Sequence, residues 1–237
     1  MNIVGLDKLS LLDYPDHVCC IVFTKGCNMK CPFCHNSDLV LNTETQNTMD
    51  ESFVFKFLEN RKGLIDGVCI TGGEPTLQHD LKDFIVNVKE LGYKVKLDTN
   101  GLYPSALIDL IENDLLDYVA VDIKNSFDKY AMTCGVQDVD TKKIKQTIDY
   151  LMQSEIDYEF RTTVLRRYHT ETDMRKLSDM LCGCKHYYLQ KFRKVDSVID
   201  GRCEELSDNE VAMYLTIVRE KIPHAEARGI LLEDVNT

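Results

Sequence analysis

The chain has 237 residues, of which 44% are hydrophobic and 28% are charged, so its composition is that of a globular protein rather than a disordered one. Its net charge of -11 argues against DNA or RNA as a partner, because phosphate binding requires a basic surface. The N-terminus has no signal-peptide pattern and no apolar run approaches a membrane span, so we predict a cytoplasmic protein with no membrane partner.

Short apolar segments alternate with segments of helical spacing along most of the chain. After a predicted turn at residues 10–15, the expected strands are residues 18–23, 67–71, 93–97, 118–121, 158–164 and 186–189. Capping-box spacing predicts helix starts at Thr48-Glu51 and Ser207-Glu210, and Thr170 with Asp173 introduces another helix.

This alternation predicts one parallel α/β domain over residues 1–237, either an open doubly wound sheet or a partial barrel. A last helix and a tail, about residues 207–237, follow the alternating units, and the tail is a weak candidate for an edge strand. No linker or fixed-period repeat interrupts the pattern.

Three cysteines at C-x3-C-x2-C spacing follow the first strand, in the loop at residues 25–36. Cys27, Cys31 and Cys34 are one thiolate short of the four that a structural zinc or a fully ligated iron–sulfur cluster takes. A four-iron cluster held by three thiolates keeps one iron open to a substrate, whereas a zinc ion would need a fourth ligand, for which His35 is the nearest candidate.

The remaining seven cysteines are weaker candidates for metal binding. In a cytosolic protein, clustered cysteines more often indicate metal binding or catalysis than disulfides. Cys19, Cys20 and Cys69 lie in apolar runs and are expected in the core. A second metal site at Cys182, Cys184 and Cys203 is not favoured, because no pair has the C-x2-C spacing.

Polar residues follow each of the other predicted strands. Because the carboxyl ends of parallel strands meet at one rim, we expect these side chains to gather there. They are Gly72, Gly73, Glu74, Asp98, Asn100, Asp122, Lys124, Arg161 and Gln190. Gly-Gly-Glu-Pro taken alone is an ordinary turn, but its position one strand after the cysteine loop favours a functional interpretation.

The cysteine loop resembles that of the radical S-adenosylmethionine (SAM) enzymes, whose signature has this spacing and usually an aromatic residue, here Phe33, before the third cysteine. Cys34-His35-Asn36, with Asp13-Tyr14-Pro15 upstream, is similar to the activators of glycyl-radical enzymes, especially those of anaerobic ribonucleoside-triphosphate reductase. The resemblance covers residues 9 to 192 and implies a partial (βα)6 TIM-like barrel.

The resemblance also implies roles for the rim residues. The three cysteines would hold a [4Fe-4S] cluster whose open iron chelates SAM, and Gly72-Gly73-Glu74 would bind the SAM amino group. The segments with Asp98, Asn100, Asp122 and Lys124 would surround SAM, and the two aspartates could hold a monovalent cation beside its carboxylate. Arg161 is a weaker candidate. Gln190 stands in a region that contacts the SAM ribose in relatives, some of which carry histidine there. His35 and Asn36 are expected to shape the loop through backbone contacts.

The activity implied is reductive cleavage of SAM and formation of a glycyl radical on a partner enzyme, with a one-electron donor such as flavodoxin or ferredoxin. Anaerobic ribonucleotide reductase is the favoured partner, and an enzyme of the pyruvate formate-lyase type is an alternative. Two other functions stay open: a radical SAM enzyme acting on a small molecule, such as a deazaguanine synthase, and a zinc-binding interaction module. The zinc module would leave the rim carboxylates unexplained.

Overall fold

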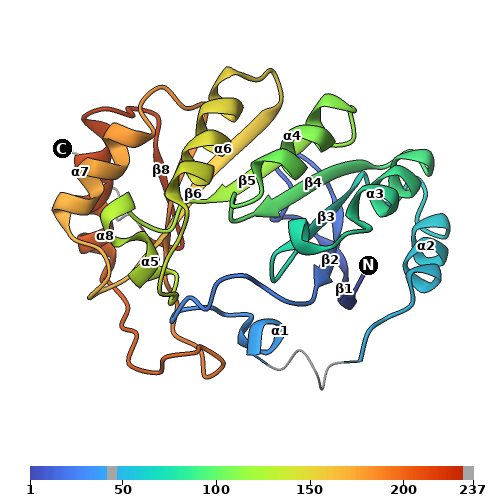
Figure 1. Cartoon of the computed structure of the whole chain (residues 1–237), viewed down its shortest axis with the longest axis horizontal. Coiled ribbons are helices and arrows are strands. Elements are labelled where there is room, and N and C mark those ends of the chain that lie inside the picture. Colours follow the sequence, from blue (N-terminus) through green and yellow to red (C-terminus); the bar gives the residue numbers. More distant parts are fainter. Residues whose placement is uncertain (42–46, 232–237) are drawn as a thin grey trace.

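The computed structural model describes residues 1–41 and 47–231 (Figure 1). The strands are β1 (Ile3–Ser10), β2 (Cys19–Thr24), β3 (Gly67–Gly72), β4 (Lys94–Thr99), β5 (Tyr118–Asp122), β6 (Asp157–Val164), β7 (Tyr187–Lys191) and β8 (Glu226–Arg228). The helices are α1 (Ser37–Leu41), α2 (Glu51–Glu59), α3 (Leu81–Glu90), α4 (Pro104–Glu112), α5 (Tyr130–Thr133), α6 (Thr141–Gln153), α7 (Glu171–Met180) and α8 (Asp208–Arg219), with short 3-10 turns at Pro75–Leu77 and Phe127–Lys129.

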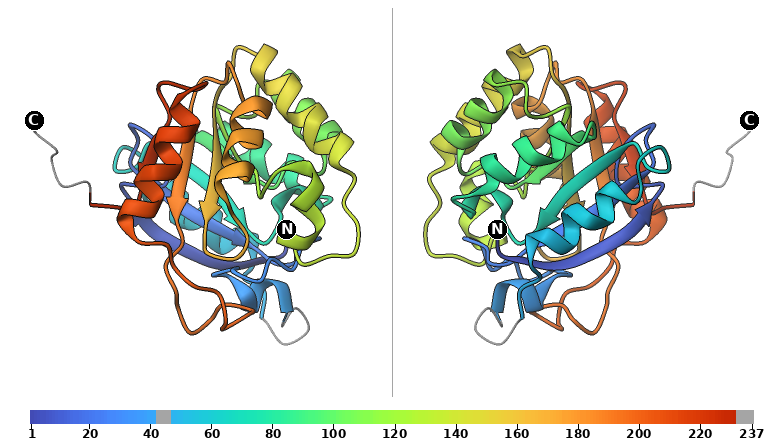
Figure 2. Two further views of the ribbon diagram at one scale, coloured as in Figure 1. Left: turned by 90° about the vertical axis from the view of Figure 1, so that its left-hand side faces the viewer. Right: turned by 90° about the vertical axis from the view of Figure 1, so that its right-hand side faces the viewer.

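All eight strands form one sheet in sequence order, from β1 to β8. Strands β2 to β8 pair in parallel, and β1 pairs antiparallel with β2. Helices lie along the outer side of the curved sheet, as Figures 1 and 2 show. The fold is therefore an α/β partial barrel of the TIM type, as predicted.

Two apolar clusters lie on the two faces of this sheet. Successive side chains of a strand point to opposite faces, and β2 divides accordingly. Cys20 and Val22 belong to the large cluster that also contains the helix residues, whereas Cys19 and Ile21 belong to a small cluster with Tyr118. The small cluster fills one end of the barrel interior, which leaves the end at the strands' carboxyl termini for polar groups.

The edges of the sheet differ from the prediction at one side. Six strands were predicted, whereas the sheet has eight, because it also contains β1, which was not predicted, and β8. The weakly specified tail does supply an edge strand, β8, while residues 232–237 of that tail lie outside the described residues. None of the helices in the described part of the chain combines the length and apolar composition needed to cross a bilayer.

Helix starts follow the predicted caps in two of three cases. Thr170 with Asp173 and Ser207 with Glu210 form capping boxes at α7 and α8. The box predicted at Thr48 is wrong, because α2 begins two residues later. Its N-cap is Asp50, whose carboxylate accepts a hydrogen bond from the Ser52 backbone N–H.

Candidate active site

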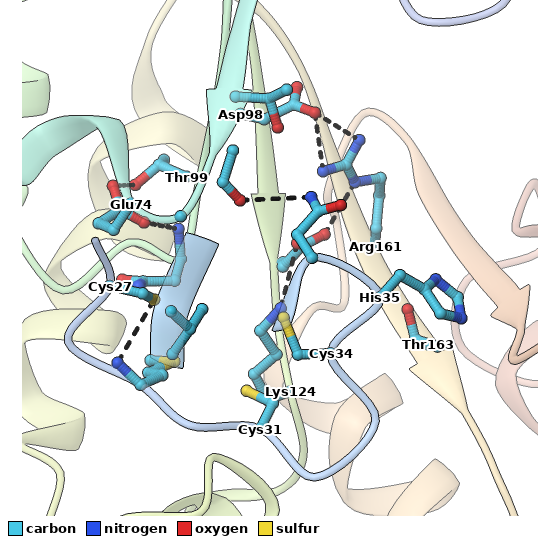
Figure 3. Close-up of a pocket in the computed structure, with 18 of the residues that line it drawn as sticks. Cys27, Cys31, Cys34, His35, Glu74, Asp98, Thr99, Lys124, Arg161 and Thr163 are labelled. Atoms are coloured by element: carbon cyan, nitrogen blue, oxygen red, sulfur yellow. Dashed lines mark hydrogen bonds and ion pairs between the residues drawn. The ribbon is translucent and has the colours of Figure 1, made fainter. Parts of the chain in front are cut away.

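The cysteine loop leaves β2 and lines a cavity of about 380 Å³ at the carboxyl ends of the strands (Figure 3). All thirteen side chains or glycines predicted for the site line this cavity, although they come from six strand ends: Cys27, Cys31, Phe33, Cys34, Gly72, Gly73, Glu74, Asp98, Asn100, Asp122, Lys124, Arg161 and Gln190. The barrel topology brings them together, as the strand-end argument predicted.

The glycine turn after β3 packs directly on the cysteine loop. A Cβ atom at Gly73 would overlap the carbonyl group of Gly26, so only glycine fits there. Gly73 N–H donates to the Thr24 carbonyl at 2.9 Å and Glu74 N–H donates to the Gly26 carbonyl at 2.8 Å. The turn therefore fixes the start of the loop that carries the three thiols.

His35 faces away from the cysteine sulfurs (Figure 3). Its ring stacks on Phe192 with centroids 5.4 Å apart, and its Nε2 lies 2.6 Å from the Arg193 carbonyl oxygen. The Asn36 amide donates to the Gly72 carbonyl at 3.5 Å. Both residues thus shape the loop through backbone contacts, as expected, and His35 is not placed as a zinc ligand.

The donor set suits an iron–sulfur cluster better than a single ion. Within residues 1–41 and 47–231, no three His, Cys, Asp or Glu side chains converge on a point that a single metal ion would occupy. A four-iron cluster offers a separate iron to each thiolate, so its ligands need not converge on one point. Three thiols on one loop around one cavity fit that group.

The three thiols differ in acidity. Burial raises the pKa of Cys27 to about 12 and raises that of Cys34. A hydrogen bond from the Cys134 thiol lowers the pKa of Cys31 to about 7. The charge of Lys124 acts in the same direction, and burial opposes both. The hydrogen bond from Cys134 thus favours the thiolate form of Cys31.

Phe33 forms an apolar wall beside the thiols. It is buried, and its ring centroid lies 6.1 Å from that of Tyr168 and 6.4 Å from that of Phe192. The side chain anchors the loop between Cys31 and Cys34 and limits access of water on that side.

Glu74 is buried with only neutral hydrogen-bond donors around it. Its Oε1 accepts from the backbone and hydroxyl of Thr76 and, at 2.7 Å, from the hydroxyl of Thr99. Its Oε2 accepts only from the backbone N–H of Asn100, at 2.7 Å. Burial raises the pKa of this carboxyl despite these bonds. Oε2 thus keeps acceptor capacity for a cationic group entering from the cavity.

The Asn100 side chain connects the third strand end to the cysteine loop. Its amide nitrogen donates to the Asn28 side-chain oxygen at 2.7 Å, and its side-chain oxygen accepts from the Leu102 N–H at 3.1 Å. Asn100 is therefore held in place from both ends at the edge of the cavity.

Asp98 and Asp122 lie on neighbouring strands with Arg161 between them. The guanidinium donates to Asp122 at 2.9 Å and to Asp98 at 3.2 Å through two nitrogens. Lys124 donates to Asp122 at 3.1 Å. Burial alone would raise the pKa of each aspartate, and the neighbouring cations more than offset it, so both pKa values are below the ordinary range. The cation predicted between these aspartates stays a prediction.

Gln190 reaches the cavity from β7. The Thr163 hydroxyl lies 3.5 Å from its side-chain oxygen, and both residues line the cavity. The predicted contact with a ribose stays a prediction.

Three residues of this region were missed by the sequence analysis: Lys96, Thr99 and Thr163. Lys96 is 2% exposed and pairs with Asp98 inside the barrel. It stands two residues before Asp98 on the same strand, so strand alternation already places both on one face. The two-residue alternation of side chains along this strand would have identified Lys96.

The other cysteines do not form a second centre among the described residues. Cys182 is exposed and contacts the Lys221 carbonyl, whereas Cys184 and Cys203 are buried. Cys19, Cys20 and Cys69 are buried, as predicted.

The chain is similar to proteins of known family. The sequence profile described as the Radical SAM superfamily matches residues 21–181. A protein of Methanocaldococcus jannaschii, provisionally named a glycyl-radical enzyme activating enzyme, is 37% identical over 237 residues, which cover 95% of each chain. The pyruvate formate-lyase-activating enzyme of Listeria monocytogenes is 34% identical over 115 residues, 44% of this chain and 46% of the relative.

A solved structure supports the fold. The protein SuiB of Streptococcus suis, bound to its precursor peptide SuiA, superposes with a TM-score of 0.70 at 16% identity, over 88% of this chain and 48% of SuiB. At this identity the likeness concerns the fold alone. The sequence matches show that the chain is an enzyme of the radical SAM superfamily and belongs among the glycyl-radical enzyme activating enzymes.

Proposed function

We propose that the chain holds a [4Fe-4S] cluster on Cys27, Cys31 and Cys34, cleaves SAM reductively, and generates a glycyl radical on a partner enzyme. The observation that carries the proposal is the single cavity lined by the three thiols together with the polar groups of five further strand ends. When bound, the cluster supplies the electron that splits SAM into methionine and a 5′-deoxyadenosyl radical, which takes a hydrogen atom from a glycine.

The chain's own residues position the substrate for that step. The free acceptor capacity of Glu74 Oε2 suits the SAM ammonium group, since carboxylate and ammonium form a charge-assisted hydrogen bond. The cationic side chains of Lys124 and Arg161 suit its carboxylate. Gln190 and Thr163 also line the cavity, where their polar groups suit the hydroxyl groups of a ribose. Phe33 keeps water from one side of the thiols.

We propose anaerobic ribonucleoside-triphosphate reductase as the partner and a flavodoxin or ferredoxin as the electron donor. The Cys34-His35-Asn36 segment supports this choice, as does the lack of any cysteine between Cys34 and Cys69 that could hold an additional cluster. An enzyme of the pyruvate formate-lyase type is the second candidate, favoured by the identity to the Listeria relative.

The test is made without oxygen. The reconstituted, reduced protein is mixed with SAM and the reductase, deoxyadenosine is assayed, and the electron paramagnetic resonance spectrum is recorded. A glycyl-radical doublet is the expected result. Deoxyadenosine without a doublet would contradict the choice of partner and direct the test to a pyruvate formate-lyase type enzyme or a small substrate. Absence of both products would contradict the proposal as a whole.

Two cysteine variants form a matched pair for the same assay. We expect Cys34→Ser to lose the cluster absorbance and deoxyadenosine formation. Cys182→Ser removes an exposed thiol outside the cavity, so its rate should change by about twofold or less. Equal rates in the two variants would refute the assignment of the cluster ligands.

A further inference from the structure

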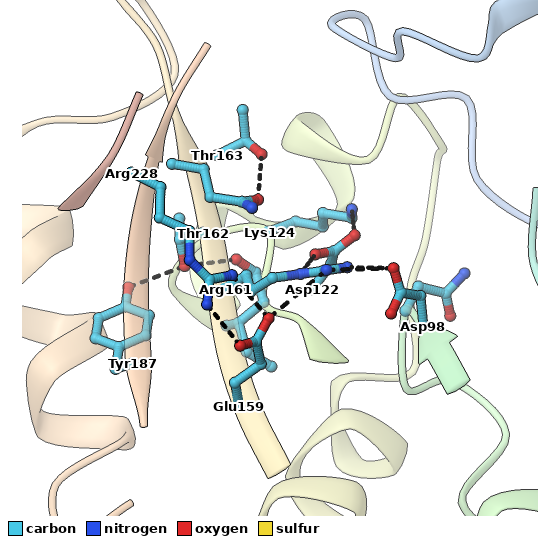
Figure 4. A network of polar contacts seen from close by, with 12 residues as sticks. Asp98, Asp122, Lys124, Glu159, Arg161, Thr162, Thr163, Tyr187 and Arg228 are labelled. Carbon is cyan, nitrogen blue, oxygen red and sulfur yellow. Dashed lines mark hydrogen bonds and ion pairs between the residues drawn. The ribbon is translucent and has the colours of Figure 1, made fainter. Parts of the chain in front are cut away.

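Every carboxylate oxygen of Asp98 and Asp122 already has a cationic partner within the chain. Figure 4 shows the contacts of Arg161 with both aspartates and of Lys124 with Asp122. For Asp98, Oδ1 accepts from the Lys96 ammonium and Oδ2 from two nitrogens of Arg161. For Asp122, Oδ1 accepts from Arg161 Nε at 2.9 Å and Oδ2 from the Lys124 ammonium at 3.1 Å. A metal ion between the two aspartates would lie against one of these cationic donors or displace it.

Arg161 is held in this position from behind. Its Nη1 lies 3.7 Å from Glu159, which is buried and receives two bonds from Arg228 at 2.9 and 2.8 Å. The hydroxyl of Tyr118 donates to the same carboxylate at 3.1 Å. Arg161 itself is 13% exposed. The Arg161 guanidinium is thus fixed inside the barrel by its contacts and is not a surface group.

The charges of this network leave one positive charge in excess. The cations are Lys96, Lys124, Arg161 and Arg228, and the carboxylates are Asp98, Asp122 and Glu159. A single excess positive charge suits one anionic group of a ligand in the cavity. A bound metal cation would add a second positive charge at short range in a poorly solvated place, which is unfavourable.

We infer that Arg161 fills the place between Asp98 and Asp122 that a monovalent cation was predicted to occupy, so the enzyme works without a metal ion there. The residues present do not fit the ion, because a cationic donor already contacts every carboxylate oxygen and a metal ion there would lie against that positive charge. The inference rests on the proposed function only in taking SAM as the ligand whose binding reports on the site.

The first experiment uses the wild-type chain. SAM affinity of the reconstituted protein is measured by equilibrium dialysis in potassium, sodium or tetramethylammonium chloride at one ionic strength. Because screening is then constant, we expect the dissociation constants to agree within about twofold. Potassium that strengthens SAM binding by about fivefold or more, the range of genuine coupling between two sites, would overturn the inference.

A second readout needs no SAM. Thallium(I) is a potassium analogue whose NMR line broadens on binding to protein. We expect no broadening that potassium competes away in the wild-type chain, and a competed signal would overturn the inference. If SAM fails to bind in every salt, the proposed function fails, whereas the thallium result still decides whether a cation binds.

A pair of variants tests Arg161 itself. Arg161→Gln opens the position between the aspartates, so potassium should now raise the melting temperature and strengthen SAM binding by about fivefold or more. Arg175→Gln is the matched control, since that arginine is half-exposed and pairs with Glu220 far from the cavity. An Arg161→Gln chain that responds to potassium no more than the control would show that Arg161 does not take the cation's place.

Discussion

Two sets of carboxylates share the rim of the barrel and are stabilised in opposite ways. Glu74 is surrounded by neutral donors, and burial raises its pKa. Asp98 and Asp122 are surrounded by cations, which hold their pKa values below the ordinary range against the effect of burial. Hydrogen bonds to neutral donors stabilise a carboxylate less than adjacent cations do, so the two sets present different charges to the cavity.

The difference teaches how one rim can hold a zwitterion. The Glu74 carboxyl has no cationic partner within the chain, which suits an ammonium group of the ligand. At the aspartates the chain's own cations outnumber the carboxylates, which suits a carboxylate group of the ligand. An amino acid head group carries both charges, and the methionine part of SAM is such a group.

The largest expected effect comes from removing the central cation. Arg161→Met leaves two partly buried carboxylates without their shared partner, so we predict a loss of about 3 to 5 kcal/mol in the free energy of unfolding, measured by urea denaturation. Arg175→Met, which breaks an exposed pair, should cost about 1 kcal/mol or less. Equal losses of unfolding free energy in Arg161→Met and Arg175→Met would show that Asp98 and Asp122 do not depend on Arg161 more than a surface pair depends on its arginine.

The neutral donors around Glu74 are tested at Thr99. Thr99→Val keeps the shape but removes the hydroxyl that donates to Glu74, so the free energy of unfolding should fall by about 1.5 to 3 kcal/mol. Thr216→Val is the control, because that exposed hydroxyl only donates to the Ala212 carbonyl in its own helix, and its cost should be about 0.5 kcal/mol or less. A cost at Thr99 no greater than at Thr216 would argue against an ionised Glu74.

A buried histidine on the charged side provides a pH test. His169 Nε2 lies 2.9 Å from the Lys124 carbonyl, with Asp173 and Lys129 the nearest charges, and burial lowers the pKa of His169 to about 4 from 6.5. The unfolded chain binds more protons between these values, so stability falls with falling pH. We expect His169 to lower the free energy of unfolding by about 2 kcal/mol when the pH falls from 7.5 to 5.

The measurement compares unfolding free energies across that range in two variants. His169→Gln should flatten the dependence, whereas His79→Gln, at a side chain that is 90% exposed, should leave it unchanged. A slope that persists in His169→Gln would show that other groups carry it.

The smallest effect is expected at the surface. Lys145 and Asp149 form an exposed pair at helical spacing, so Lys145→Ala should cost only about 0.3 to 0.5 kcal/mol, and less at high salt. Urea denaturation at two salt concentrations measures it. A cost near that of Arg161→Met would mean that burial is not what separates the rim pairs from surface pairs.

Much of the site was predictable because strand ends are a topological property. Cys27, Glu74 and Asp122 are far apart in sequence, yet a parallel sheet with short connections places them at one rim. What the sequence could not supply is the pairing among them. Asp98 and Asp122 were expected to need a cation, and nothing local to either indicates that Arg161 would bridge both.

The errors in the fold have local causes. Strand β1 is an edge strand with a mixed burial pattern, so it lacks the continuous apolar run that identified β2. At α2, Thr48 and Glu51 have the spacing of a capping box, but Asp50 caps the helix instead, since its carboxylate reaches the Ser52 N–H.

The cysteine loop is held by segments that lie after it in the chain. The Gly26 carbonyl accepts from Glu74 N–H, the Lys30 N–H donates to the Cys134 carbonyl at 2.9 Å, and the Pro32 carbonyl accepts from Asp200 N–H at 2.8 Å. During synthesis the three thiols therefore emerge long before the contacts that shape their loop. The native arrangement of the three thiols is therefore complete only when the segment near Asp200 has docked on the loop. The geometry of this loop thus depends on contacts that form late in folding.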